Sequence, residues 1–392
     1  MPRIEQPGHE VKNTLSAEKR SSLELIRRRA DAGRMDFTQF DTAIDKLPRR
    51  RVGFYPTPFH ALPNLSAAYG INLFLKREDL AGPSAISGSK MRLAEFILGR
   101  ALEAGVTHVI TQGAFLTNSG LQFAAACLSA RITPVLVLTR NVSRYGELGE
   151  FRGNYLLNKT MGVETHVVNV AGNEWHSPAE DARVLEVITA RKAELEAQGH
   201  KVLVVGTGGA HPDGFIAHAL TFRELLEQSG AAGVELDYVY HTIGTGTALP
   251  GMLAAKLSLG HPVKFRSISI QRVNDEDRMN AGVIVERTKA VLATLGAPVP
   301  DDATIRAEID IDQRFIGEEY AVASPESTAA IRELARAEGV FVGPVYTGKG
   351  LAGLLDHARS GRIPAGSNVA FLHTGDTGNL FEIPEVVGPI AD

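Results

Sequence analysis

The chain has 392 residues, of which 44% are hydrophobic and 22% charged, and its formal net charge is −4. This length indicates two domains or one large α/β unit, and the absence of a global positive charge argues against a nucleic-acid-binding protein. The single cysteine, Cys127, excludes an internal disulfide framework and is expected in the core, because it lies in the apolar run FAAACLSA.

No segment reaches the roughly 18 consecutive apolar residues of a membrane-spanning helix. The N-terminus also lacks the apolar stretch of a signal peptide. We therefore expect a cytoplasmic protein without membrane or nucleic-acid partners.

Residues 1–50 form a highly charged N-terminal extension. Residues 17–34 predict one helix, and the segment DKLPRRR that ends at Arg51 predicts a basic link. No aromatic residues interleave with the arginine clusters, so we expect a solvated face or a subunit contact there rather than a nucleic-acid site.

From Pro56 onward, short apolar runs alternate with helix-like segments of about 12 residues or more, which predicts a parallel α/β architecture. A first strand region is expected within residues 51–90, and an inserted smaller α/β layer around residues 95–205. The apolar runs are HVIT, PVLVL, ETHVVNV, KVLVV, DYVYHTI, RSISI and NVAFLHT.

The segment GPSAISGSKMRLAEFILGRAL joins a loop of small residues to a helix that begins at Lys90 or just after it. The helix is expected to bury one stripe and to end before Gly105. A helix start favours anions, so a lysine there needs a reason. It is either a solvent-exposed lysine or an amine that forms a Schiff base with a phosphate-bearing aldehyde, pyridoxal phosphate. The stripe comprises Leu93, Ile97 and Ala101, with Ala94, Leu98 and Leu102 beside them.

Three loops of small residues follow predicted strands. The loop Gly244–Thr247 precedes a helix that starts near Leu249 and predicts either a phosphate site or an ordinary turn. It lacks the lysine of a Walker loop, and its glycine spacing is too wide for a dinucleotide fingerprint. Gly206–Phe215 is interpreted as a connector. In the third loop, Thr374, Gly375 and Thr377 follow the last strand, where ligands of open α/β sheets bind.

Five segments carry a family resemblance: PTPFHALPNLSAAYGINLFLKREDLAGPSAISGSKMRLAEFIL, ITQGAFLTNSGLQFAAAC, GTGTALPGMLA, GPVYTGKGLAGLLD and FLHTGDTGNLF. Together they cover about residues 52–385 and resemble the pyridoxal-phosphate enzymes grouped with 1-aminocyclopropane-1-carboxylate deaminase and D-cysteine desulfhydrase. That group belongs to the tryptophan synthase β-like class, fold type II. The resemblance implies two open, mostly parallel twisted sheets flanked by helices. We expect a larger cofactor-binding domain at 51–94 and 206–392 and a smaller α/β domain at 95–205.

The resemblance also implies roles for individual residues. Lys90 would be the Schiff-base lysine, Asn118 would hydrogen-bond the ring hydroxyl oxygen, and Thr374 would lie near the ring. Tyr346 matches an active-site tyrosine, and Tyr320 matches a second one. The phosphate would be held by Gly244, Thr245, Gly246 and Thr247.

Several positions depart from the family pattern. Ser87-Gly88-Ser89 precedes Lys90 where G-G-N is usual, and Thr117-Asn118-Ser119 stands for S-N-H. Thr117 keeps the hydroxyl that contacts substrate or carries protons in relatives. Thr347 stands where the cyclopropane deaminases have an acid. Lys349 is interpreted as a phosphate-side or surface lysine.

Asp376 stands where a second glycine is common. If its side chain faces the site, it would favour a cationic substrate tail over an anionic one. The alternative is an exposed loop aspartate.

These observations predict a pyridoxal-phosphate-dependent lyase or deaminase acting on a small amino acid. The substrate amine would displace Lys90, Lys90 or Tyr346 would move a proton, and elimination or ring opening would give a keto acid and ammonia. Alternatives are a β- or γ-replacement synthase, an amino-acid racemase, or a non-catalytic cofactor-binding protein. The resemblance implies a homodimer. The histidines lack metal-ligand spacing, so no catalytic metal is predicted.

Overall fold

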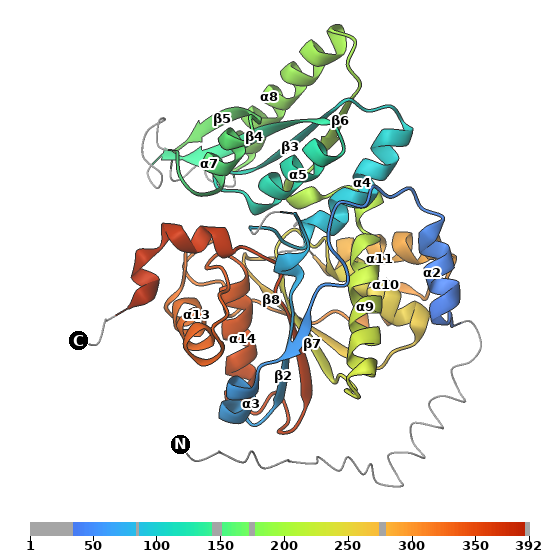
Figure 1. Ribbon diagram of the computed structural model, residues 1–392, viewed down its shortest axis with the longest axis vertical. Helices are drawn as coiled ribbons and strands as arrows, with labels where there is room; N and C mark the ends of the chain where they lie inside the picture. The colour runs from blue at the N-terminus through green and yellow to red at the C-terminus, as the bar shows by residue number, and fades with distance from the viewer. Residues whose placement is uncertain (1–33, 84–85, 143–150, 172–176, 274–279, 389–392) are drawn as a thin grey trace, which may run out of the picture.

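The computed structural model describes residues 34–83, 86–142, 151–171, 177–273 and 280–388. These residues form two separate sheets, one of six strands and one of four, each flanked by helices (Figure 1). This is the mixed α/β architecture predicted from the alternating apolar runs. None of the helices in the described part of the chain has the length and apolar character needed to cross a membrane.

The six-stranded sheet has the order β1-β2-β10-β7-β8-β9. Only β1 runs antiparallel to its neighbour, so the sheet is mostly parallel, as predicted. The strands in this order are β1 (Phe59–Ala61), β2 (Asn72–Lys76), β10 (Asn368–Leu372), β7 (Tyr238–Ile243), β8 (Lys264–Ser269) and β9 (Ile311–Asp312).

Helices cover both faces of this sheet, and each face has its own hydrophobic core (Figure 1). The larger core contains buried side chains of α2 (Phe37–Asp45), α9 (Ala217–Ala231), α10 (Leu249–Leu259), α11 (Ala281–Leu295) and α12 (Asp302–Ala307). The other contains those of α3 (Pro63–Tyr69), α13 (Pro325–Glu338) and α14 (Thr347–Arg359).

The four-stranded sheet is wholly parallel, with the order β5-β4-β3-β6. Side chains of α8 pack on one face, and those of α5 and α7 lie on the other (Figure 1). Its elements are β3 (His108–Ala114), α5 (Asn118–Ser129), β4 (Thr133–Asn141), α7 (Gly153–Thr160), β5 (Glu164–Val170), α8 (Pro178–Ala197) and β6 (Val202–Val205).

Each sheet contains one point at which the strand order reverses. The chain proceeds from β7 to β8 and β9 on one side, whereas β10 lies on the other side of β7. In the smaller sheet, β4 and β5 lie to one side of β3 and β6 to the other. Ligands of open α/β sheets bind beyond the carboxyl ends of the strands at such points. The fold therefore predicts a site formed by the loops after β3, β6, β7 and β10.

The helix that begins at Lys90 is confirmed as α4 (Lys90–Glu103), but its predicted single buried stripe is wrong. Ten of its residues are buried, including Arg92 and Glu95, and Leu102 is 41% exposed. The helix contacts α5 on one side and α9 on another, so its burial is set by both sheet systems.

The N-terminal extension is only partly described, because the helix predicted at residues 17–34 lies outside the described residues apart from Arg34. Phe40 and Ile44 of α2 are buried in the larger core. Arg49 forms an ion pair with the buried Glu95 at 2.6 Å, so a solvated face is wrong for this arginine. The ion pair instead attaches the basic link that ends at Arg51 to α4.

Two further expectations concern the interior and the domains. Cys127 is fully buried in the larger core, as predicted, and burial raises its thiol pKa to about 12. The predicted domain boundary after residue 94 falls inside α4, and the domain boundaries stay a prediction.

Candidate active site

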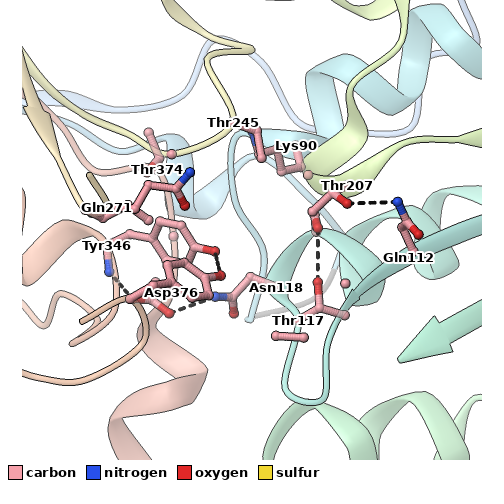
Figure 2. Close-up of a pocket in the computed structure, with 18 of the residues that line it drawn as sticks. Lys90, Gln112, Thr117, Asn118, Thr207, Thr245, Gln271, Tyr346, Thr374 and Asp376 are labelled. Atoms are coloured by element: carbon pink, nitrogen blue, oxygen red, sulfur yellow. Dashed lines mark hydrogen bonds between the residues drawn. The ribbon is translucent and has the colours of Figure 1, made fainter. Parts of the chain in front are cut away.

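A cavity of about 170 Å³ lies where the reversal points of the two sheets meet (Figure 2). Its lining includes the loops after β3, β6, β7 and β10, as the strand order predicts, together with the start of α4 and residues of α8. Eight of the residues predicted for the site line it: Lys90, Thr117, Asn118, Gly244, Thr245, Tyr320, Tyr346 and Thr374. The sequence thus identified residues from both sheets that the fold brings together.

Lys90 lies at the first position of α4 and lines the cavity. Its Nζ donates a hydrogen bond of 2.6 Å to Oγ1 of Thr247, so the solvent-exposed interpretation is wrong. Burial, with a smaller contribution from the Arg287 guanidinium, lowers the pKa of Lys90 to about 8. About a tenth of the amine is therefore neutral and nucleophilic at pH 7, far more than for a lysine with an ordinary pKa.

The loop Gly244–Thr247 presents unused hydrogen-bond donors. No backbone N–H of residues 244–248 donates to another residue in the described part of the chain, and α10 begins directly after them. Arg287 of α11 donates to the carbonyl oxygens of Thr245 (2.9 Å) and Gly246 (3.1 Å) and brings a positive charge to the loop. Unpaired N–H groups at a helix start beside a cation form an anion site, which fits the phosphate of pyridoxal phosphate.

A buried ionic network joins α4, which begins at Lys90, to the segment Lys76–Asp79 (KRED). Arg92 pairs with Glu78 at 2.6 Å and with Glu224 at 3.0 Å, and Lys76 pairs with Glu224 as well. Burial opposes ionisation of Glu78, but Arg92 outweighs it and lowers the carboxyl pKa to about 2. Since breaking a buried pair leaves an uncompensated charge, this network holds β2, α4 and α9 together.

Asp376 lies between Asn118 and Tyr346 (Figure 2). Its Oδ1 accepts from the side-chain amides of Asn118 (2.7 Å) and Asn379 (2.8 Å). Its Oδ2 accepts from the backbone N–H groups of Val345 and Tyr346, both at 2.8 Å. The side chain is 3% exposed, so the exposed-loop interpretation is wrong.

These contacts also limit what Asp376 can do to a substrate. The four N–H groups occupy the lone-pair sites of the carboxylate, so it has little capacity left for a cationic substrate tail. Burial raises its pKa to about 6, while the hydrogen bonds from Tyr346, Asn379, Asn118 and Val345 lower it. Asp376 is therefore a positioning residue for Asn118 and Tyr346.

Two tyrosines and the start of α5 form the wall opposite Lys90. The hydroxyl groups of Tyr320 and Tyr346 are hydrogen-bonded to each other, with ring centroids 6.0 Å apart. Thr117 caps α5, since its Oγ1 accepts from the Gly120 N–H at 3.1 Å. Within the described residues, the N–H groups of Asn118 and Ser119 have no acceptor, so they can bind a carboxylate.

Several polar residues of the lining were missed by the sequence reasoning, among them Gln112, Thr207 and Gln271. Gln112 near the end of β3 donates to Oγ1 of Thr207 at 3.0 Å, and Gln271 follows β8. Their signal was position, since each lies at the carboxyl end of a parallel strand. The connector interpretation of Gly206–Phe215 is wrong, because Thr207 and Gly208 line the cavity.

Four other residues lie outside the cavity lining. Gly246 and Thr247 lie behind it, although Thr247 still binds Lys90. Oγ1 of Thr347 accepts from the Gly343 N–H at 2.8 Å and faces the protein interior. Lys349 is neither a phosphate-side nor a surface lysine, because it is fully buried and donates to the carbonyl oxygens of Ile316 and Glu319.

The histidines form no site of their own in the described residues, where no group of three or more histidine, cysteine, aspartate or glutamate side chains is placed to hold a metal ion. Burial lowers the pKa of His218 to about 3 and that of His241 to about 4. Both are therefore neutral at physiological pH.

Comparison with known proteins gives the geometry its context. A protein of Pyrococcus abyssi is 30% identical over 345 residues, which cover 88% of this chain and 96% of that protein. The 1-aminocyclopropane-1-carboxylate deaminase of Variovorax paradoxus is 28% identical over 336 residues, 85% of this chain and 95% of that enzyme.

A solved structure described as an ACC deaminase homologue has a TM-score of 0.77 and 28% identity, and the match covers 90% of this chain and 99% of that one. Processed threonine deaminase isoform 2 of Solanum lycopersicum shares the fold, with a TM-score of 0.59 and 16% identity over 91% of this chain and 96% of its own. The predicted fold-type-II architecture is confirmed.

The model of the family described as "Pyridoxal-phosphate dependent enzyme" matches residues 51–375. That match spans both sheets and every loop that lines the cavity up to Gly375. The predicted cofactor class and enzyme class are thereby confirmed, whereas the roles of individual residues stay predictions. The chain belongs to the family of pyridoxal-phosphate-dependent enzymes.

Proposed function

We propose that this enzyme is a lyase or deaminase that releases ammonia and a keto acid from a small amino acid, with its cofactor anchored at Lys90. The observation that carries the proposal is the position of the Lys90 amine. It lies beside Thr247 of a loop with unpaired backbone N–H groups, and its pKa is lowered to about 8. A nucleophilic amine next to an anion site suits an aldehyde that also carries a phosphate.

Each end of the cofactor has residues that would hold it. The N–H groups of residues 244–248 and the charge of Arg287 would bind the phosphate. Asn118, oriented by Asp376, would donate to the ring hydroxyl oxygen, and Thr374 would lie near the ring. When bound, pyridoxal phosphate supplies an electron sink that stabilises negative charge next to the substrate nitrogen.

The chain's own groups would bind the substrate and move its protons. The N–H groups of Asn118 and Ser119, at the start of α5, would hold the substrate carboxylate. The Lys90 amine and the Tyr346 hydroxyl, which both line the cavity, would take and return a proton. Tyr320 is hydrogen-bonded to Tyr346 and would fix the direction of that hydroxyl. Thr117 lies beside them and would contact the substrate through its hydroxyl.

The relatives suggest where a substrate search should begin. Relatives named 1-aminocyclopropane-1-carboxylate deaminase make that cyclopropane amino acid the first compound to test. The buried Thr347 replaces the acid of those enzymes, so small D- and L-amino acids with a β-leaving group belong in the same panel. A replacement synthase would need an added nucleophile, and a racemase would release no ammonia.

The anchor is tested by absorption spectroscopy of the purified protein before and after borohydride treatment, followed by peptide mapping. We expect a yellow absorption band that borohydride bleaches, with the reduced adduct on Lys90. Lys90→Ala should lose the band and reduce turnover at least about 1,000-fold, since it removes both the anchor and a proton carrier. Full activity of that variant would disprove the assignment.

The predicted homodimer and cytoplasmic location also belong to the proposal. Phe54, Phe341 and Phe381 are more than half exposed, which is consistent with a surface that another subunit covers. Light scattering of the holoenzyme should give twice the chain mass, and fractionation of cells should place the protein with the cytoplasmic marker.

A further inference from the structure

A second chamber of about 580 Å³ adjoins the cavity that contains Lys90. The two spaces share a wall, because Ala114, Thr117, Asn118, Tyr320 and Tyr346 line both. The chamber is more than three times as large as the first cavity, so a three- or four-carbon amino acid would leave most of it unfilled. The volume leaves room for a substrate side chain that extends beyond the tyrosines.

Arg332 gives the chamber its principal unpaired charge. It lies on the face of α13 that also presents Pro325 and Thr328, since positions i, i+3 and i+7 of a helix share one side. One N–H of its guanidinium donates to the Val386 carbonyl oxygen at 3.2 Å. Among the described residues, no carboxylate lies within ion-pair distance of this guanidinium. Arg332 is therefore held in place but keeps donors for an anion.

A second arginine contributes to the chamber, but its charge is already balanced. Arg152 precedes α7 and forms an ion pair with Glu382, which also lines the chamber. Arg152, Arg332 and Glu382 are the only acidic or basic side chains in the lining that the structure describes, so the chamber has a net charge of +1. Asp376 lies outside this lining, and its carboxylate is already hydrogen-bonded. The electrostatics of the chamber favour an anion.

We propose that this chamber binds an acidic group at the end of the substrate side chain, with Arg332 as its principal ligand. The substrate class is then an α-amino acid with a second acidic group, a carboxylate or a phosphate. This inference rests on the proposed function, because the α-amino group must reach Lys90 while the α-carboxylate binds at the start of α5. The side chain would pass Thr117 and Tyr346 into the chamber.

The test measures binding of matched amino-acid pairs to the holoenzyme through changes in the cofactor absorption spectrum. The pairs are glutamate and glutamine, aspartate and asparagine, and O-phosphoserine and serine, each as D- and L-isomers. We expect the acidic member of at least one pair to bind about tenfold tighter or more. The reason is that a hydrogen bond between charged groups is stronger than one that involves a neutral group. The comparison between carboxylates and phosphoserine identifies the acidic group.

Variants of α13 separate recognition from folding. Arg332→Gln should remove the preference for the acidic member and change binding of the neutral member less than twofold, whereas Arg332→Lys should retain part of the preference. The matched control is Arg336→Gln, one turn further along the same helix and exposed, which should change neither value.

Three outcomes would overturn the inference. Equal affinity within every pair would show that the chamber does not recognise charge. Equal weakening of both members by Arg332→Gln would show that Arg332 supports the fold or binds the α-carboxylate. A holoenzyme that deaminates small neutral amino acids without any preference for acidic ones would overturn this inference alone, whereas the absence of the Lys90 adduct would overturn the proposed function as well.

Discussion

Asp376 is a residue whose burial makes the stability of the protein depend on pH. Its pKa is raised from 3.8 to about 6 by burial, even though four N–H groups donate to its carboxylate. The folded protein therefore binds a proton that the unfolded chain releases between about pH 4 and pH 6. The contribution of Asp376 to stability falls as the pH rises through this window. A shift of about two pH units corresponds to about 3 kcal/mol.

We predict that Asp376→Asn removes this contribution. The free energy of unfolding of the variant relative to the wild type should rise by about 2.5 kcal/mol between pH 4 and pH 7.5, which is most of the full effect. Denaturant unfolding of the cofactor-free proteins measures this difference, and other titrating groups cancel in the comparison. Asp45→Asn is the control, because the Asp45 side chain is 73% exposed. A relative stability that does not change with pH would contradict the prediction.

The residues of the site differ in how far the sequence could predict them. The sequence singled out Lys90, Tyr346 and Thr374, which line the cavity, because each lies in a short motif at a strand or helix end, and their roles stay predictions. Asp376 and Lys349 could not be assigned, because their environments depend on distant segments. Asp376 receives its amide from Asn118, and Lys349 binds carbonyl oxygens about 30 residues earlier in the chain.

At the scale of secondary-structure elements, the loops after β6 and β7 support each other. Gly208 has a φ of +68°, and a Cβ there would lie 2.5 Å from Oγ1 of Thr245. We predict that Gly208→Ala displaces the Gly244–Thr247 loop and weakens cofactor binding at least about tenfold, because the N–H groups of that loop would no longer converge. Fluorescence titration of the cofactor-free protein with pyridoxal phosphate measures the dissociation constant.

Gly233→Ala is the control that distinguishes the steric collision with Thr245 from the effect of backbone strain. Gly233 has nearly the same φ, +69°, but no atom lies within 4 Å of a Cβ built on it. Both substitutions incur the cost of a left-handed conformation, about 1–2 kcal/mol, in the folded state. Only Gly208→Ala should weaken the binding of pyridoxal phosphate. Equal dissociation constants for the two variants would show that the loops are independent.

The apolar runs predicted strands better than the periodicity predicted burial. All seven runs correspond to strands, because each is a short apolar segment between turns. The two-residue strand β9 was not predicted, since so short an element has no pattern. In α4, the prediction of a single buried stripe was wrong because α5 and α9 both pack against the helix. The sequence of the helix alone does not specify two packing partners.

At the scale of the whole molecule, neither sheet contains a complete site. The larger sheet supplies the Gly244–Thr247 loop and Thr374, and the smaller one supplies Gln112, Thr117 and Thr207. The sequence indicated α/β units but not which strand ends meet, because those contacts join segments that are distant in the chain, from Gly208 and Thr245 to Asn118 and Asp376. A cofactor bound between the two sheets would contact both.

We predict that pyridoxal phosphate stabilises both parts of the fold together. At a concentration 1,000 times the dissociation constant, binding to the native state adds about 4 kcal/mol. For a chain of 392 residues this corresponds to a rise of about 5 °C in the unfolding temperature. Differential scanning calorimetry should show a single transition that shifts upward with the cofactor. Inorganic phosphate, which would occupy only the loop, should give a smaller shift.

Lys90→Ala tests the origin of this stabilisation, because it leaves the phosphate loop intact while removing the covalent anchor. The variant should gain less stability from pyridoxal phosphate than the wild type does, since the covalent anchor is lost and only the non-covalent contacts of the loop and the ring remain, whereas its response to inorganic phosphate should be unchanged. Two separate transitions, of which only one responds to the cofactor, would contradict the prediction. They would mean that the cofactor binds to one sheet and its helices alone and does not stabilise the contact between the two sheets.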